Sequence, residues 1–465
     1  MILHMTGRLV LASNRTARPG APSAGGLAVA LQDALEERGG GVWFGWSGET
    51  PEREARGVNL CSYGRVDFAL ADLTPRERDG YYLGYANRAL WPVFHYRVDL
   101  AEFDDEAFSI YEDVNRRFGR LLSQLLRPDD VVWIHDYHFL LLARELRYHD
   151  WRGPTGFFLH IPFPAPEVLA ALPNHSQIAH GLAEHDLVGF QTRRDVANFR
   201  RYMAEQHGAA LEEHGWLEVF GRRLRAAAFP VGIDPAEIRR SAADPEARAP
   251  SERLGRILGT QALVIGVDRL DYSKGVPQRL AAFGALLDEY RELRGKVSFL
   301  QISPPSRETV HAYADLREEV DRLAGRINSD HADLTWTPIR FLARGYPRAV
   351  LAGLYRLARV GLVTPLHDGM NLVAKEFVAA QDPEDPGVLV LSEFAGAAER
   401  MESALLVNPH DAHAVAEAVR RALEMPLEER IERWRALDEV VARGDVATWR
   451  RDFLAALEAA APVGA

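Results

Sequence analysis

Two stretches of the carboxyl-terminal half combine residue types that bind sugars and phosphates. The first, HDGMNLVAKE (residues 367–376), joins an acid, a glycine and an amide at the start of a helix-period segment. The first turn of a helix has backbone N–H groups without internal partners and a partial positive charge, so it attracts anions. We expect Asp368 and the amides after it to bind sugar hydroxyls, and Glu376 to bind the cis-diol of a ribose. The alternative is that Asp368 or Asn371 is only an N-cap.

The second stretch, VDRLDYSKG (residues 267–275), supplies positive charge. Arg269 and Lys274 are separated by a short turn, so both side chains can converge on one diphosphate without a metal ion between them. Each charge-assisted contact of this kind contributes roughly 1.5 to 3 kcal/mol. The alternative is a weak surface ion pair between Arg269 and Asp271.

The amino-terminal half supplies a second set of candidates. SNR (13–15) ends an apolar run, and the glycines of SAGGLAVAL (23–31) suit contact with a phosphate or a sugar at a helix start. WIHDYH and FFLHIPFP place Asp136 and His160 directly after two further apolar runs. A carboxylate and an imidazole can meet there over a shared substrate.

Short apolar runs that alternate with amphipathic segments would position these residues. Near-continuous apolar strands between helices are typical of parallel sheets covered on both faces. Ligands of such sheets bind beyond the carboxyl ends of the strands. We therefore predict an α/β fold with two doubly wound Rossmann-like domains facing across a cleft. The expected strands are 8–13, 131–136, 156–162 and 187–192 in the first series, and 262–270, 297–304, 334–342, 360–366 and 387–392 in the second.

The pattern breaks once, near FPVGIDPAEI (229–238), where prolines and a glycine interrupt it. This break predicts a first domain over residues 1–235 and a second over 236–447. Residues 448–465 are expected to form a final helix that packs back on the first domain.

Composition excludes several classes of protein. A single cysteine, Cys61, excludes a disulfide framework and favours the cytoplasm. No apolar run approaches the ~18 residues of a membrane span, and the net charge of -11 repels nucleic acid and anionic membranes. His135 and His138 would suit a metal, but the H-E-x-x-H arrangement is absent and no third ligand is evident. We expect neither a metal nor a cofactor.

Taken together and in order, these motifs resemble the trehalose-6-phosphate synthase family. The likeness covers nearly the whole chain. It implies a glycosyltransferase B fold in which residues 1–235 bind glucose 6-phosphate and residues 236–447 bind a nucleotide sugar. The matching stretches are SNR, SAGGLAVAL, WFGWSGE, YYLGYANRALWPVFHYR, WIHDYH, FFLHIPFP, LVGFQT, VDRLDYSKG, LVTPLHDGMNLVAKE and VLVLSEFAGAA.

The resemblance also implies a reaction. Glucose would pass from a nucleoside diphosphate glucose, with UDP-glucose the expected donor, to glucose 6-phosphate with retention, giving α,α-trehalose 6-phosphate in the first step of trehalose biosynthesis. It implies three sets of residues. The acceptor would contact Arg15, Tyr82, Trp91, Asp136 and Arg307. The donor would contact Gly26, Arg269, Lys274, Tyr346, Asp368, Leu372, Val373 and Glu376. The catalytic residues would be Asp136, His160, Arg269 and Lys274.

The sequence disfavours some other functions and leaves others open. A nicotinamide-dependent dehydrogenase would need a G-x-G-x-x-G after a first strand, which is missing, and a phosphorylase would need a context for a pyridoxal-bearing lysine. A related transferase could use glycerol 3-phosphate or a cyclitol phosphate, with the Tyr82 and Trp91 region as the discriminating feature. A non-catalytic sugar-phosphate sensor would usually lose charged site residues, which this chain keeps. The donor base stays open between uridine, guanosine and adenosine. We expect a homo-oligomer, a dimer or tetramer, and a separate trehalose-phosphate phosphatase acting downstream.

Overall fold

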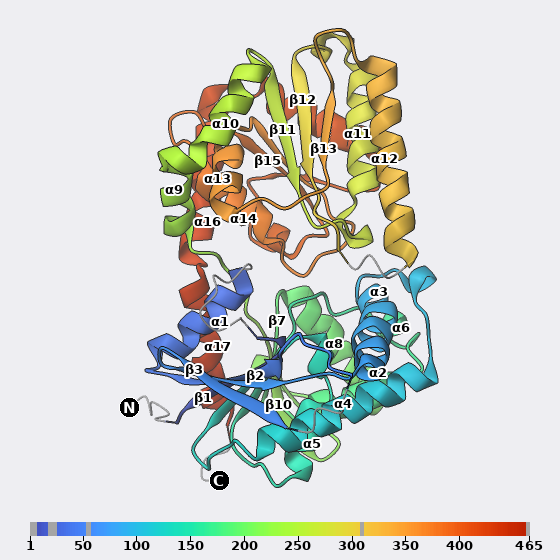
Figure 1. Cartoon of the computed structure of the whole chain (residues 1–465), viewed down its shortest axis with the longest axis vertical. Coiled ribbons are helices and arrows are strands. Elements are labelled where there is room, and N and C mark those ends of the chain that lie inside the picture. Colours follow the sequence, from blue (N-terminus) through green and yellow to red (C-terminus); the bar gives the residue numbers. More distant parts are fainter. Residues whose placement is uncertain (1–6, 17–25, 53–56, 307–310, 462–465) are drawn as a thin grey trace. The chain divides into compact units, whose positions relative to one another are not determined.

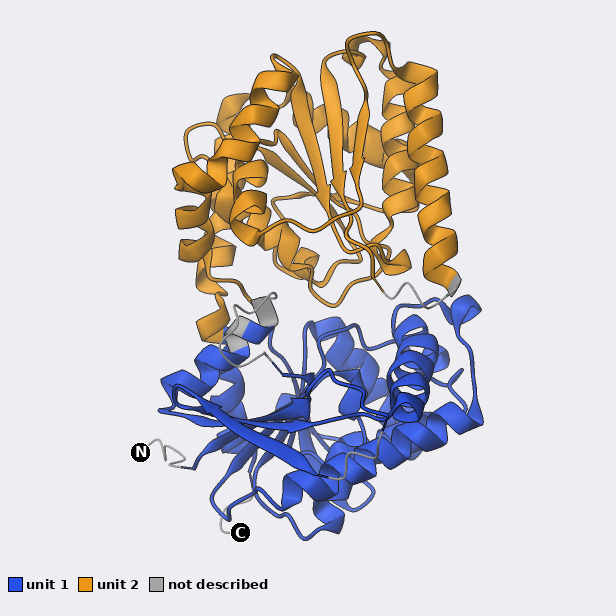
Figure 2. Cartoon of the chain, in the orientation of Figure 1, with its two compact units in different colours: residues 1–230, 449–465 blue, residues 231–448 orange. Residues whose placement is uncertain are grey.

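Figure 1 shows the computed structural model of the chain, which describes residues 7–16, 26–52, 57–306 and 311–461. The chain forms two compact units (Figure 2): unit 1 comprises residues 1–230 and 449–465, and unit 2 comprises residues 231–448. Each unit is built on one largely parallel sheet with helices packed against it, which confirms the predicted α/β class with two Rossmann-like units. Within the described ranges, no helix is both long enough and apolar enough to cross a lipid bilayer.

In the described part of unit 1 the sheet has ten strands in the order β3-β4-β2-β1-β5-β6-β7-β10-β9-β8. Pairing is parallel from β4 to β10 and antiparallel at both edges. The central strand β5 is buried at every residue, as a sheet covered on both faces requires. The strands are β1 (Leu9–Arg15), β2 (Gly41–Trp46), β3 (Val58–Tyr63), β4 (Val66–Ala71), β5 (Val131–His135), β6 (Thr155–Phe158), β7 (Leu187–Phe190), β8 (Ala210–Leu211), β9 (Trp216–Val219) and β10 (Arg222–Ala228).

One helix of unit 1 is unusual. The segment η1 (Arg78–Leu90) is a π-helix that continues α2 (Pro75–Glu77), whose first turn is closed by a capping box between Thr74 and Glu77. π-helical turns are rare and are frequently found at functional sites. The other helical segments are α1 (Gly26–Glu37), α3 (Trp91–Phe94), η2 (Val98–Leu100), α4 (Asp105–Ser123), η3 (Tyr137–Phe139), α5 (Leu142–Tyr148), α6 (Pro166–Leu169), α7 (His175–Ala183), α8 (Arg193–His207), η4 (Glu213–Gly215) and α17 (Val446–Ala460).

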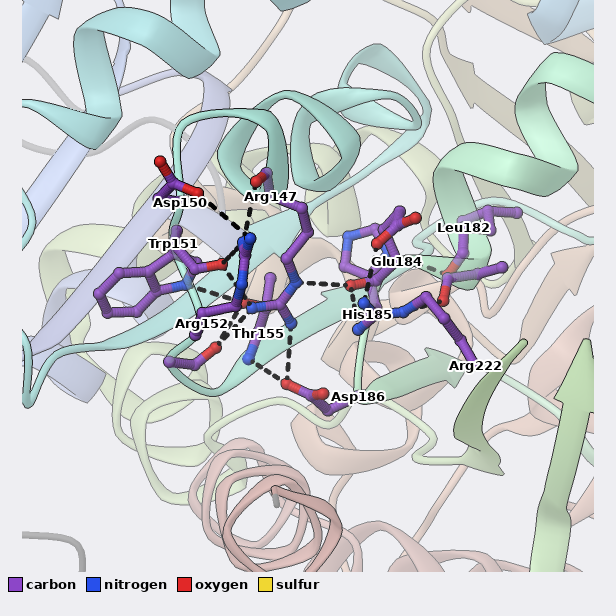
Figure 3. Close-up of polar contacts among 12 residues, drawn as sticks. Arg147, Asp150, Trp151, Arg152, Thr155, Leu182, Glu184, His185, Asp186 and Arg222 are labelled. Atoms are coloured by element: carbon purple, nitrogen blue, oxygen red, sulfur yellow. Dashed lines mark hydrogen bonds and ion pairs between the residues drawn. The ribbon is translucent and has the colours of Figure 1, made fainter. Parts of the chain in front are cut away.

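A buried polar cluster lies at the amino ends of β6 and β7 (Figure 3). Arg147 donates to the Oδ2 atom of Asp186 at 3.2 Å, and the same oxygen accepts the backbone N–H of Thr155 at 2.8 Å. Burial raises the pKa of Asp186, and Arg147 opposes that rise. His185 lies beside this pair and is fully buried. Because ligands of such sheets bind at the carboxyl ends of strands, we assign this cluster a structural role.

Unit 2 contains, within the described residues, a six-stranded parallel sheet in the order β13-β12-β11-β14-β15-β16. Its strands are β11 (Ala262–Val267), β12 (Val297–Ile302), β13 (Ile339–Leu342), β14 (Val360–Val363), β15 (Val388–Ser392) and β16 (Leu405–Val407). Its helical segments are α9 (Pro235–Ala243), α10 (Pro245–Leu258), η5 (Tyr272–Lys274), α11 (Val276–Glu289), η6 (Arg291–Leu293), α12 (His311–His331), α13 (Arg348–Leu357), α14 (Leu372–Ala380), η7 (Gly396–Glu399), α15 (Ala412–Glu424) and α16 (Leu427–Arg443).

The predicted strand over 334–342 is wrong in its first half, because only β13 at its end is extended and paired. The carboxylate of Asp333 accepts the backbone N–H groups of Thr335 and Trp336 at 2.7 and 2.9 Å and folds this segment into a turn. The indole of Trp336 then donates to the carbonyl of Val297 at 3.0 Å. Side-chain hydrogen bonds to the backbone here replace the expected ladder.

Candidate active site

Asp136 and His160 lie at the carboxyl ends of two neighbouring strands of unit 1. Asp136 follows β5 and His160 follows β6, and these strands pair in parallel. The backbone N–H of His160 donates to Oδ1 of Asp136 at 3.3 Å. Asp136 has a φ of 73°, a conformation that side-chain-bearing residues rarely adopt and that concentrates at functional sites. The structure thus brings this carboxylate and this imidazole together at one edge of the sheet.

The imidazole of His160 is neutral near pH 7. Burial lowers its pKa to about 3. Behind it lies His135, the last residue of β5, whose Nδ1 is 3.1 Å from Nε2 of His160. Burial, and after it the repulsion from His160 whenever that ring is protonated, also lowers the pKa of His135 well below its usual range. A neutral imidazole can exchange hydrogen bonds with sugar hydroxyls, but it brings no charge to the site.

Arg15, the last residue of β1, is exposed and rests on an aromatic group. Its Cζ lies 4.9 Å from the ring centroid of Trp46, a cation–π contact. Gly48, with a φ of +92°, makes room for it, because a Cβ there would lie 1.9 Å from a guanidinium nitrogen of Arg15. Tyr82 of η1 packs on Trp46 at 5.5 Å and stacks on His138 at 5.8 Å. Sequence reasoning missed Trp46 and the packing role of His138, although WFGWSGE and WIHDYH both contain the signal.

Trp91 begins α3 directly after η1 and is only 5% exposed. Its ring lies 4.1 Å from that of His95 and 5.6 Å from that of Tyr137, the residue after Asp136. The Nδ1 atom of His95 is 2.7 Å from the carbonyl oxygen of Trp91. A side chain packed this deeply can shape the wall of an acceptor site but has little surface to offer a ligand directly.

In unit 2, residues from the two carboxyl-terminal motifs form an ion pair. Nζ of Lys274 lies 2.5 Å from Oδ2 of Asp368. Lys274 follows β11 and Asp368 follows β14, and these strands are neighbours. Asn371 donates to the same carboxylate oxygen at 3.0 Å, and its own side-chain oxygen caps α14 by accepting the N–H of Ala374 at 3.3 Å. Of the two N-cap candidates, Asn371 is therefore the cap of this helix.

The first turn of α14 carries Leu372 and Val373, both partly exposed. The N–H groups of a first turn have no acceptor inside the helix and can bind an anion. One turn further along, Oε1 of Glu376 accepts from Nε and Nη2 of Arg348 at 3.2 and 3.1 Å, and Arg348 also donates to Glu237 at 2.9 Å. Burial raises the pKa of Glu376, and Arg348 opposes that rise. The arginine thereby orients the carboxylate proposed for the ribose.

Arg279 of α11, which sequence reasoning missed, is fully buried beneath these residues. Its guanidinium joins the ends of β11, β12 and β14 to the loop that carries Lys274. Burial raises the pKa of Asp268, and the charges of Arg279 and then Lys274 oppose the rise. The hydrogen bonds of Arg279 reach Oδ2 of Asp268 at 2.8 Å, Oγ1 of Thr364 at 3.0 Å, Oε1 of Gln301 at 3.1 Å and the carbonyl of Lys274 at 3.2 Å.

The remaining donor candidates of unit 2 are more exposed. Arg269 lies on the surface after β11, and its Nη1 donates to Oγ of Ser306 at 3.2 Å. Tyr346 is partly exposed, and its hydroxyl accepts from Nε of Arg344 at 2.7 Å. Neither contact fixes a ligand by itself, so the assignment of both residues to the donor stays a prediction.

Two predicted contacts border segments that the structure does not describe. Arg307 lies outside the described residues, and Gly26 is the first residue of α1, directly after such a segment. The predicted roles of these two residues therefore rest on the sequence alone. Within the ranges that are described, no group of three or more histidine, cysteine, aspartate or glutamate side chains could hold a metal ion.

Known proteins match this chain along almost its whole length. The family model of glycosyltransferase family 20 matches residues 6–459. The chain belongs to glycosyltransferase family 20. The resemblance to trehalose-6-phosphate synthases is confirmed by relatives of that name. One from Sinorhizobium fredii is 47% identical over 451 residues, which cover 96% of this chain and 97% of that protein.

Solved structures of relatives have the same fold as this family 20 enzyme. The α,α-trehalose-phosphate synthase (UDP-forming) of Burkholderia xenovorans, in complex with glucose 6-phosphate, superposes with a TM-score of 0.93 at 48% identity, covering 97% of this chain and 100% of that one. A structure from E. coli bound with UDP-2-fluoro glucose superposes with a TM-score of 0.93 at 44% identity, covering 97% and 99%. The glycosyltransferase B fold and the enzyme class, a glycosyltransferase, are confirmed.

Proposed function

We propose that this family 20 enzyme transfers glucose from UDP-glucose to glucose 6-phosphate with retention of configuration, giving α,α-trehalose 6-phosphate. The observation that carries the proposal is the Lys274–Asp368 ion pair at the carboxyl edge of β11 and β14, beside the first turn of α14. One cation, one carboxylate and the first-turn N–H groups of Leu372 and Val373 match the diphosphate and sugar of a nucleotide sugar. The Burkholderia relative with glucose 6-phosphate and the E. coli relative with UDP-2-fluoro glucose support the two substrates.

The donor would sit on unit 2. Lys274 and Arg269 would neutralise the diphosphate as it leaves, and the amides of Leu372 and Val373 would bind its oxygens. Asp368 would accept hydrogen bonds from hydroxyls of the transferred glucose, and Glu376 from those of the ribose. The ion pair prepares the site, because the carboxylate of Asp368 already holds the ammonium of Lys274 in place before a diphosphate arrives.

The acceptor would sit on unit 1. Arg15, steadied on Trp46, would bind the phosphate of glucose 6-phosphate together with Arg307, and Tyr82 would contact the sugar. The neutral imidazole of His160 and the carboxylate of Asp136 would bind hydroxyls of the reacting sugars. The acceptor hydroxyl would attack on the face from which the diphosphate leaves, and the departing diphosphate would take its proton. Catalysis would rest on positioning and on stabilising the charge of the leaving group.

Product analysis tests the proposal. The purified chain is incubated with glucose 6-phosphate and, in separate reactions, with UDP-, GDP- and ADP-glucose; nucleotide release is measured and the disaccharide phosphate is identified by NMR. We expect UDP release and an α,α-linked product. Release without glucose 6-phosphate dependence, or a product formed only with glycerol 3-phosphate or a cyclitol phosphate, contradicts it. A glucosyl adduct on Asp136 found by mass spectrometry contradicts only the proposed mechanism, in which the acceptor attacks on the face from which the diphosphate leaves without a covalent intermediate.

We further infer a homo-oligomer, a cytoplasmic location from the single cysteine, and a separate trehalose-phosphate phosphatase that consumes the product. Light scattering tests the first of these. A particle of one chain's mass at micromolar concentration contradicts it.

A further inference from the structure

A fully buried histidine stands behind the site histidine of unit 1. His135 ends β5, His160 follows β6, and their rings are inclined by 25° with centroids 5.3 Å apart. Nδ1 of His135 lies 3.1 Å from Nε2 of His160. Since burial keeps both rings neutral, each carries one proton on its two nitrogens. One ring must therefore donate to the other, which leaves only two arrangements.

In the first arrangement His135 donates from Nδ1, and the proton of His160 resides on Nδ1. In the second arrangement His160 donates from Nε2, and the proton of His135 is forced onto its own Nε2. The two arrangements present opposite groups to a ligand: His160 offers an N–H donor in the first and a bare acceptor nitrogen in the second.

The packing around His135 favours the first arrangement. Nε2 of His135 is buried without a hydrogen-bond partner among the described residues, and so are the indole N–H groups of Trp133 and Trp449. The ring of Trp133 lies 4.5 Å from that of His135, and the ring of Trp449 lies 6.4 Å from it. The second arrangement would add a third orphaned N–H to this aromatic cluster. Buried N–H groups are orphaned less often than buried acceptors.

The two arrangements differ in the group that His160 presents on the side facing away from His135. His160 is only partly buried, and with Nε2 facing His135 its Nδ1 is the nitrogen left for a ligand. Its neighbour Asp136 is an acceptor when ionised. A sugar hydroxyl both donates and accepts one hydrogen bond, so an N–H donor beside a carboxylate suits it. A second acceptor in the place of that N–H would not.

We propose that His135 is a positioning residue that fixes His160 in the tautomer with its proton on Nδ1, so that His160 donates to a hydroxyl oxygen of a bound sugar. The identity of this ligand rests on the proposed function. The tautomer itself is a property of the free chain and can be measured without any substrate.

The first test is 15N NMR of the full-length chain labelled at its histidines, in which the chemical shifts and couplings show which ring nitrogen carries the proton. The signals of His135 and His160 are assigned by their loss in the variants His135→Leu and His160→Leu. We expect the proton on Nδ1 in both rings. A proton on Nε2 of His160 overturns the proposal.

The second test compares two substitutions of His135. His135→Asn keeps an amide donor near the place of Nδ1, whereas His135→Leu removes the donor and leaves an apolar side chain among apolar rings. We expect His135→Leu to lower kcat/KM by about ten- to a hundredfold, by analogy with the loss when the partner that orients a metal-binding histidine is removed, and His135→Asn to lose less than about threefold. In His135→Leu the NMR signals of His160 should show a mixture of tautomers, while the melting temperature stays near that of the wild type.

His185 provides the matched control. It is fully buried in the same unit, burial lowers its pKa to about 3, and its Nε2 has no partner among the described residues, but it lies in the cluster at the amino ends of the strands (Figure 3). His185→Leu should leave kcat/KM unchanged. Full activity of His135→Leu, or equal losses in His135→Leu and His135→Asn, overturns the positioning role. If the wild-type chain transfers no glucose, the proposed function fails, and the NMR measurement still decides the tautomer.

Discussion

Replacing Arg279 by methionine tests whether the buried Arg279–Asp268 ion pair holds the proposed donor site together. The substitution keeps an unbranched apolar side chain as far as the position of Nε and removes the guanidinium, which is 0% exposed and pairs with Asp268, itself 3% exposed. Removing one partner of a buried ion pair costs about 3–5 kcal/mol, because the other charge stays buried without compensation. For a unit of this length about 1 kcal/mol shifts the melting temperature by roughly 2–4 °C. We therefore expect a decrease of about 6–20 °C, measured by calorimetry.

The pH dependence of this deficit follows from the same pair. Burial already raises the pKa of Asp268 in the folded chain, and Arg279 opposes the rise. Without Arg279 the rise is larger, so the folded variant holds the proton of Asp268 more tightly than the unfolded chain does, and acid favours its folding. The deficit should shrink as the pH falls from about 8 to about 5.

Two further variants make this result decisive. The double variant Arg279→Met with Asp268→Asn removes both charges and should recover most of the lost stability. Arg326→Met is the control, because Arg326 is 72% exposed in α12 and its contact with Asp330 is a surface pair worth less than about 1 kcal/mol. A melting temperature of Arg279→Met equal to that of Arg326→Met, or a double variant no more stable than Arg279→Met, would refute the reasoning.

Three other changes have expected outcomes. Arg269→Ala should lower kcat by roughly 10² or more with folding intact, the usual loss for one charge-stabilising group; near-normal turnover contradicts its role. Gly275→Ala should be more destabilising than Gly295→Ala, since both have positive φ but only at Gly275 would a Cβ meet a carbonyl, that of Thr364, at 2.6 Å; equal melting temperatures contradict this. Glu376→Gln should raise the KM for the donor by about tenfold through one lost charge-assisted hydrogen bond, with little effect on the KM for glucose 6-phosphate; equal increases in both contradict the ribose contact.

The sequence predicted the sheets because buried parallel strands show as apolar runs, and it placed Lys274 and Asp368 at strand ends that the structure joins. The strand predicted before Ile339 was too long, because the apolar and β-branched residues of this segment match a strand. The observed turn depends instead on the backbone N–H groups that donate to the carboxylate of Asp333. Side-chain hydrogen bonds of this kind leave no periodic signal. Patterns of apolar residues therefore predict where strands lie better than where they begin.

The residues that sequence reasoning missed share one property: they act beneath the site. Arg279 lies beside Leu280 on the buried stripe of α11, where a charged residue is expected to point outward. Its burial depends on acceptors from β11, β12 and β14, which converge only in the folded sheet. His135, which the sequence suggested only as a metal ligand, is likewise the last residue of an apolar run, where its positioning of His160 leaves no signal. Sequence motifs identify the candidate ligand-binding groups, because those groups stand in loops after strands. The groups that hold them in place are recognisable only from the atoms they contact.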